Sequence, residues 1–188
     1  AFTTGLGPRD SGVRLNGDVA DAIADLDSLA HVAAHAGRPL RVFDGGWDSF
    51  APIVRAEQGV LVSGVEAMEG SATAPAHPLD LVYFEDVDDQ GHRHGAGSDE
   101  YRAAARRGAA LVERHRQRLG PRDVLVVLSD HGHRPDGGHG GLEPGVPLAY
   151  FALASPVFIA AGAPGELPLV DLAPSLPALA RLAPPACA

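Results

Sequence analysis

VLVVL at residues 124–128, followed at once by SDHG at residues 129–132, is the stretch that decides the fold class of this chain. Its five apolar, mostly β-branched residues are typical of a strand that is buried on both faces, as the strands of parallel sheets are. The polar residues that follow mark the end of the strand. Ligands of such sheets gather where the strands end, so residues 129–132 are also the first candidates for a functional site.

The rest of the chain alternates between short apolar runs and amphipathic segments. The apolar runs predict strands, and the segments with apolar residues three or four apart predict helices. Strands are expected at residues 40–43, 60–63, 81–84, 124–128 and 147–155, and helices at residues 18–36, 99–119 and 171–182. This alternation predicts an α/β fold, a three-layer sandwich around a mainly parallel sheet, in a single domain that spans residues 1–188.

The composition limits the partners of the chain. It has 24 Asp and Glu residues against 15 Lys and Arg residues, a formal net charge of −9, and nonspecific binding of nucleic acid needs clustered cations instead. The single cysteine, Cys187, excludes an intrachain disulfide and a cysteine-rich zinc module. No apolar run reaches the roughly 18 residues of a membrane span. We therefore expect an acidic globular domain whose partners are not nucleic acids.

Histidines are concentrated in three glycine-containing segments. Five of the nine histidines lie between residues 92 and 139. The segments are DDQGHRHG at residues 88–95, SDHGH at residues 129–133 and GGHGG at residues 137–141, and each follows a predicted strand or lies in the loop beyond it. Carboxylates together with imidazoles bind zinc, or manganese where oxygen ligands are more numerous. Three such loops at the strand ends of one sheet predict a metal site rather than solvated surface.

Three residues near these loops are expected to support the site without binding an ion. His94 and His133 each lie two residues from a better-placed histidine, so both are expected behind the ligands or in solvent. Asp44 ends the predicted strand at residues 40–43 and precedes two glycines. It is therefore expected to form a turn there or to touch the site from its strand end.

Together, Asp88-x-x-Gly91-His92-x-x-Gly95, SDHG and GGHGG resemble motifs of the alkaline phosphatase superfamily. Within that superfamily they look like the type I phosphodiesterase/nucleotide pyrophosphatase group. They are most similar to the glycosylphosphatidylinositol ethanolamine-phosphate transferases, which share a Gly-His-x-His-Gly form of the first motif. VFDGGWDSF at residues 42–50 and TTGLGP at residues 3–8 also resemble segments of those transferases. The resemblance covers the chain from residue 3 to about residue 160.

The resemblance implies a site for two divalent ions, zinc in the first place and manganese as the alternative. By position, Asp88, His92 and His139 correspond to the ligands of one ion, and Asp130 and His131 to two ligands of the other.

The catalytic nucleophile is expected outside this sequence. The family has an aspartate on a first strand and a Thr or Ser nucleophile beyond it, and by the resemblance both would lie upstream of Ala1, the first residue here. The chain is thus expected to be an N-terminally incomplete domain without its first strand, with little activity on its own.

The function that the resemblance implies is hydrolysis or transfer of a phosphoester, of the phosphodiester or phosphoethanolamine type. The substrate would be a small molecule or a lipid-linked group. Related transferases act on the non-cytosolic side of membranes, so we expect an extracytoplasmic enzyme that is tethered by segments outside this sequence. A sulfatase or mutase of the same superfamily, or a remnant that binds metal without turnover, is the alternative, because a fold alone does not determine the reaction.

Overall fold

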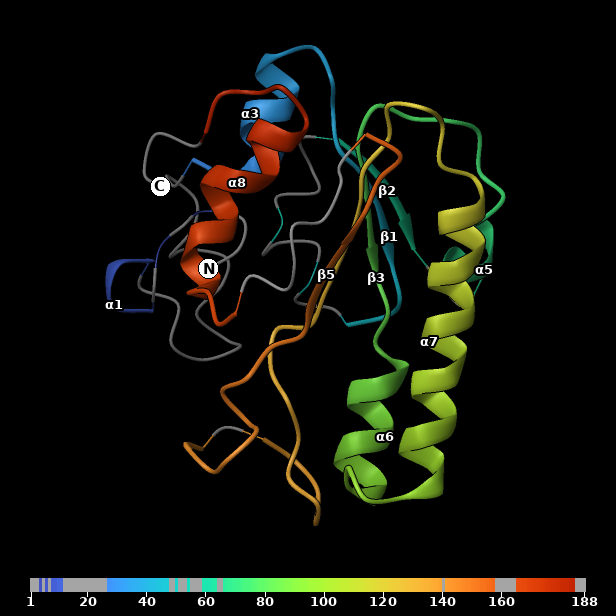
Figure 1. Cartoon of the computed structure of the whole chain (residues 1–188), viewed down its shortest axis with the longest axis vertical. Helices are drawn as coiled ribbons and strands as arrows, with labels where there is room; N and C mark the ends of the chain where they lie inside the picture. The colour runs from blue at the N-terminus through green and yellow to red at the C-terminus, as the bar shows by residue number, and fades with distance from the viewer. Residues whose placement is uncertain are drawn as a thin grey trace. The chain divides into compact units, whose positions relative to one another are not determined.

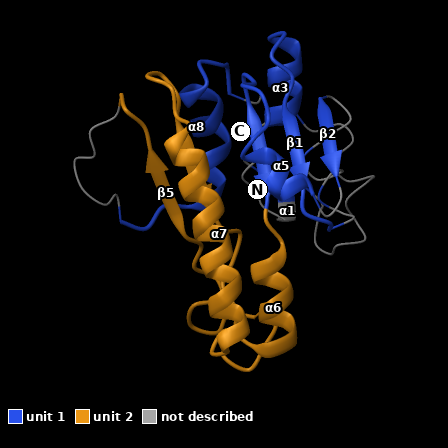
Figure 2. Cartoon of the chain, turned by 90° about the vertical axis from the view of Figure 1, so that its right-hand side faces the viewer, with its two compact units in different colours: residues 1–83, 164–188 blue, residues 84–163 orange. Residues whose placement is uncertain are grey.

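The structure, a computed structural model, describes residues 4, 6, 8–11, 27–47, 50, 54, 59–63, 66–139, 141–157 and 165–184 (Figure 1). The chain divides into two compact units (Figure 2). Unit 1 comprises residues 1–83 and 164–188, and unit 2 comprises residues 84–163. None of the described helices combines the length and the apolar character that a membrane crossing requires. The single domain expected from the sequence stays a prediction.

Some predicted features lie outside the described residues. They are the first part of the helix predicted at residues 18–36, half of the TTGLGP segment at residues 3–8, and Cys187. Ala1 also lies outside the described residues. The placement of the nucleophile and of the first strand upstream of Ala1 therefore stays a prediction.

Unit 1 is built on a parallel sheet. Its elements, in chain order, are α1 (Pro8–Ser11), α3 (Leu29–His35), β1 (Arg41–Asp44), β2 (Val60–Ser63), α5 (Ala67–Ser71), β3 (Asp80–Tyr83), the 3₁₀ helix η3 (Leu169–Asp171) and α8 (Leu172–Leu179). The three strands are parallel and lie in the order β2-β1-β3, with Val42 of β1 opposite Leu61 and Leu81. The strands form at the predicted apolar runs, and the predicted α/β class with a parallel sheet is confirmed.

The ends of α3 follow from local chemistry. The side chain of Ser28 accepts a hydrogen bond from the backbone N–H of His31 (3.3 Å), which satisfies a donor that the first helical turn leaves free. Past the other end, Gly37 has a φ of +67°, a conformation that favours glycine. In the folded unit α3 packs against α8.

The buried core of unit 1 centres on β1, the middle strand. Val42 is fully buried, and Leu40, just before the strand, is 1% exposed. Both pack with Ala30 of α3 and with Phe50, whose ring stacks on that of Tyr83 with centroids 4.1 Å apart. The edge strand β2 is far more exposed. The apolar run at residues 40–43 thus reflects its central place in the sheet.

Replacing Leu40 by alanine should lower the free energy of unfolding of unit 1 by about 2–5 kcal/mol, because it leaves a cavity in a packed core. Trp47, the only tryptophan, packs against this core, so urea unfolding followed by its fluorescence reports the change. The control is Leu167→Ala, since Leu167 belongs to the same unit and is 56% exposed. Equal effects of the two substitutions would contradict the assigned core.

Unit 2 contains a pair of helices and a pair of strands. Its elements are α6 (Asp86–His94), α7 (Asp99–Gln117), β4 (Leu125–Leu128) and β5 (Phe151–Ala154). The two helices pack side by side (Figure 1). The side chain of Ser98 accepts a hydrogen bond from the backbone N–H of Tyr101 (3.1 Å), so Ser98 caps α7 at the start of the helix predicted over residues 99–119.

The apolar run at residues 124–128 forms β4, as predicted, but its partner is antiparallel. Val126 of β4 pairs with Leu153 of β5. The described residues between the two strands contain no helix, whereas parallel pairing needs a crossover connection that is usually helical. The composition of the run therefore indicates a strand, but it does not reveal the direction of the neighbouring strand.

Candidate metal centre

The first histidine segment, expected as a loop at a strand end, forms most of helix α6. Asp88 and His92 lie four residues apart, so the helix places both side chains on one face, with 3.6 Å between Asp88 Oδ2 and His92 Nε2. The helix ends at Gly95, whose φ is +80°. Acidic residues fill its first turn and basic residues its last turn, where the helix dipole favours each charge. This helix could have been predicted from that order of charges along the sequence.

The other two histidine segments form one loop after β4 that folds back on itself. The backbone N–H of Arg134 donates to the carbonyl of Gly138 (3.0 Å), and that of Gly137 donates to the carbonyl of Arg134 (3.2 Å). Both glycines have a positive φ, which lets the backbone turn tightly. The turn brings His139 back to His131, and their rings stack with centroids 3.8 Å apart.

The same loop is attached to the C-terminal end of α6. The backbone N–H of Ala96, just after the helix, donates to the carbonyl of Arg134 (3.1 Å). The guanidinium of Arg134 donates in turn to the carbonyl of Gly137 (3.1 Å), which fixes the turn. This attachment holds the loop histidines beside the side chains of the helix.

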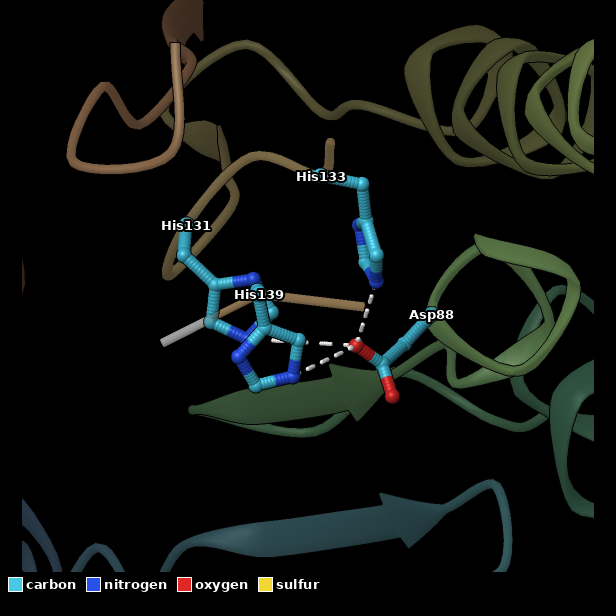
Figure 3. A group of neighbouring side chains, drawn as sticks. All are labelled: Asp88, His131, His133 and His139. Atoms are coloured by element: carbon cyan, nitrogen blue, oxygen red, sulfur yellow. Dashed lines mark ion pairs between the residues drawn. The ribbon is translucent and has the colours of Figure 1, made fainter. Parts of the chain in front are cut away.

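The Asp88 carboxylate faces three imidazoles of the loop (Figure 3). Its Oδ1 atom lies 3.1 Å from Nε2 of His133, 3.5 Å from Nε2 of His139 and 3.8 Å from Nε2 of His131. One donor atom from each of these four residues lies within 4.8 Å of the others. A carboxylate from α6 and imidazoles from the loop thus converge on one point.

Two atoms at this point are buried without a hydrogen-bond partner. Asp88 Oδ1 and His133 Nε2 make no hydrogen bond to any residue that the structure describes. Leaving buried polar atoms unpaired is costly, and a divalent ion between the donors would satisfy both. In a tetrahedral zinc site with bonds of about 2.0–2.1 Å, ligand atoms lie about 3.3 Å apart, close to the 3.1–3.8 Å found around Asp88 Oδ1. These residues therefore fit a divalent ion.

Burial favours the neutral imidazole in this group. It lowers the pKa of His133 and of His139, and neighbouring imidazoles lower it further, whereas the Asp88 carboxylate opposes the shift. A pKa below the ordinary value of about 6.5 leaves both rings neutral at pH 7, the form in which imidazole binds metals. Burial and Asp88 also raise the pKa of Tyr101, which keeps its phenol protonated.

The other two predicted ligands, His92 and Asp130, lie on the solvent-exposed side of the group. His92 Nε2 is 3.1 Å from His139 Nε2, and Asp130 Oδ2 is 3.5 Å from His131 Nε2. Their side chains are 50% and 58% exposed, against 4% for His133. The structure thus brings all five predicted ligands together, in one continuous group and not in two separate sets.

Three residues were expected to support the site. One of them, His133, lies at its centre. Among the loop histidines it approaches Asp88 more closely than His131 or His139 does. His94 is exposed on α6. Asp44, at the end of β1 in unit 1, accepts a hydrogen bond from the backbone N–H of Gly46 (3.0 Å), the turn that its position before two glycines predicts. The spacing of the histidines in the sequence does not show that His133 faces Asp88, because its position depends on how the loop packs against α6.

Comparison with known proteins finds a family that matches the chain. The family described as type I phosphodiesterase / nucleotide pyrophosphatase matches residues 42–137, just over half of the chain. No curated protein and no solved structure matches the chain. The family match includes the helix α6 and the start of the loop, and it ends two residues before His139.

Proposed function

Because the chain belongs to the type I phosphodiesterase/nucleotide pyrophosphatase family, part of the alkaline phosphatase superfamily, we propose that it hydrolyses phosphodiesters with metal ions held around Asp88. The observation that carries this proposal is the Asp88 carboxylate, whose Oδ1 is buried without a hydrogen-bond partner among the described residues and faces three imidazole nitrogens. A carboxylate with several imidazoles is a common ligand set of catalytic zinc. The family match supplies the reaction class, hydrolysis of small phosphoesters.

The buried and the exposed side chains of this group have different roles. Divalent ions bound here would polarise a phosphoryl group and activate the attacking oxygen. Asp88 contributes the negative charge that attracts a cation, and the neutral imidazoles contribute nitrogen ligands without adding positive charge. His92 and Asp130 lie on the exposed side, where substrate approaches. Because the chain carries a net charge of −9, the attraction for an anionic phosphodiester must come from the ions.

We propose that the group holds two ions and that they are zinc. Zinc in proteins usually has four ligands, and the group offers more donors than one such ion uses. The donors come from Asp88, His92, Asp130, His131, His133 and His139. The two carboxylates keep manganese as the alternative. Mass spectrometry of the purified protein should find two zinc ions per chain; one ion, or manganese, would contradict the number or the element.

We further propose a substrate of the phosphoethanolamine type, either a small molecule or a lipid-linked group. The support is the resemblance of the DxxGHxxG and GGHGG segments to the motifs of ethanolamine-phosphate transferases. The same resemblance supports transfer of the phosphoryl group as well as its hydrolysis, a nucleophile upstream of Ala1, and an extracytoplasmic, membrane-tethered enzyme.

Removing the metal should abolish hydrolysis of bis(4-nitrophenyl) phosphate by the protein expressed in its natural length. A chelator such as EDTA takes away the ions that neutralise the phosphoryl group, so activity should fall to background and return when zinc or manganese is added. Release of 4-nitrophenol, followed by absorbance, measures both steps. Full activity in excess chelator would refute the metal mechanism. Hydrolysis of 4-nitrophenyl sulfate instead of the phosphodiester would favour a sulfatase.

A further inference from the structure

His133 is buried more deeply than any other histidine that faces Asp88. Its side chain is 4% exposed, against 26% for His131 and 29% for His139. A buried imidazole normally hydrogen-bonds through its nitrogens. Nε2 of His133 has no such partner among the described residues, and the atom closest to it on Asp88, Oδ1, has none either. The two atoms lie 3.1 Å apart as an ion pair, and a metal ion between the donors would satisfy both.

The helix makes room for this ring at Gly91. A Cβ atom on Gly91 would lie 2.5 Å from Cδ2 and 2.7 Å from Nε2 of His133, closer than such atoms can approach. Glycine inside a helix costs about 0.5–1 kcal/mol relative to alanine, and α6 carries that cost where the imidazole packs on its backbone. The fit of ring to helix thus depends on the absence of a side chain at residue 91.

The ring is also held edge-on by its neighbours. The rings of Tyr101, His92 and His139 all lie at steep angles to it, with centroids 5.2–5.6 Å away. Tyr101 belongs to α7 and His92 to α6, so both helices and the loop fix the orientation of the imidazole. A ring fixed in this way keeps its Nε2 directed at the donors around Asp88 (Figure 3).

We propose that His133 binds the metal ion directly through Nε2 and completes a four-ligand site with Asp88, His131 and His139. These four residues have donor atoms within 4.8 Å of one another, and a zinc ion with four ligands can still accept a fifth in the transition state. Gly91 is then a positioning residue, which acts by leaving space for the His133 ring. This inference rests on the proposal that the group binds a divalent ion.

The direct test is NMR of the chain labelled with ¹⁵N-histidine and loaded with ¹¹³Cd²⁺, because only ligand nitrogens show one-bond coupling to the metal. We expect coupling at Nε2 of His131, His133 and His139 from this ion, and at His92 from the second proposed ion. Coupling at the other histidines but not at His133 overturns this inference and leaves the metal site intact. Absence of coupling at all histidines overturns the proposed metal site itself. The measurement needs no substitution, so folding of a variant does not affect it.

Two substitutions test the role of Gly91. His133→Ala should weaken zinc binding by more than the roughly 10- to 100-fold that loss of a supporting residue costs, and Gly91→Ala should weaken it as well by displacing the ring. His94→Ala is the control for the first, since the structure places His94 in solvent on α6. Gly70→Ala is the control for the second, since Gly70 is also helical and has no atom within 4 Å of an added Cβ. Zinc affinity, measured by competition with a chromogenic chelator, should stay unchanged in both controls. Unchanged affinity in His133→Ala contradicts the proposal.

Discussion

Replacing Asp88 by asparagine is expected to weaken zinc binding by well over 100-fold, since even loss of a residue that only supports a ligand costs about 10- to 100-fold. The substitution keeps the shape of the side chain but removes the charge that faces three imidazoles at 3.1–3.8 Å. Without that charge, the carboxylate left in the group is that of Asp130, which lies 3.5 Å from His131 on the exposed side. Competition with a chromogenic chelator measures the loss, and activity on a phosphodiester should fall with it.

Asp89→Asn is the matched control for this prediction. Asp89 is the next residue on α6, and its carboxylate pairs with Arg93 (2.9 Å) rather than with the histidine group. The same chemical change at this neighbouring position should leave zinc affinity within about twofold of the unsubstituted protein, because exposed ion pairs contribute little. Similar losses in the two variants would show that the charge of α6 as a whole, and not the Asp88 carboxylate, attracts the metal.

Replacing Gly95 by alanine is expected to lower the free energy of unfolding of unit 2 by about 3 kcal/mol or more, for two additive reasons. Gly95 has φ +80° and ψ 156°, a region that is almost restricted to glycine. In addition, a Cβ atom there would overlap the carbonyl oxygen of Pro135 and lie 3.0 Å from its carbonyl carbon and 3.1 Å from the backbone nitrogen of Gly137. These are backbone atoms, which cannot rotate away, so the loop would have to leave the end of α6.

The effect of backbone strain alone can be separated with Gly145→Ala. Gly145 also has a positive φ, of +91°, but an added Cβ has no atom within 4 Å. Its substitution should therefore cost only the conformational penalty, roughly 1–2 kcal/mol. Urea unfolding followed by far-UV circular dichroism compares the two variants, and zinc affinity should fall for Gly95→Ala alone. If both variants lose the same stability, the contact between α6 and the loop is not what holds the site together.

The elements that depend on local chemistry could be predicted from the sequence. Ser98 and the acidic residues after it start a helix through hydrogen bonding and the helix dipole, and α7 begins there. The apolar runs became strands because burial of apolar side chains drives their packing. The histidine segments could likewise be recognised as one candidate site, since their residue types already specify the chemistry of a metal ligand set.

What could not be predicted depends on contacts between distant residues. The direction of β5 beside β4 is decided by the course of the connecting loop, which the strand residues do not encode. The place of His133 depends on Gly91, 42 residues earlier in the chain, which leaves space for its ring. The spacing of His131 and His133 gives no information about which ring faces Asp88, so reasoning from the sequence put His133 either behind the ligands or in solvent.

The six side chains of the metal group all belong to unit 2, and this has a consequence by mass action. A ligand that binds only the native state adds to the free energy of unfolding, by about 2.7 kcal/mol when its concentration is 100 times the dissociation constant. With zinc bound as proposed, such linkage would make the zinc supply a determinant of how often α6 and its loop open. The availability of one inorganic nutrient would thus govern the lifetime of residues 84–163 against proteolysis, before any substrate is present.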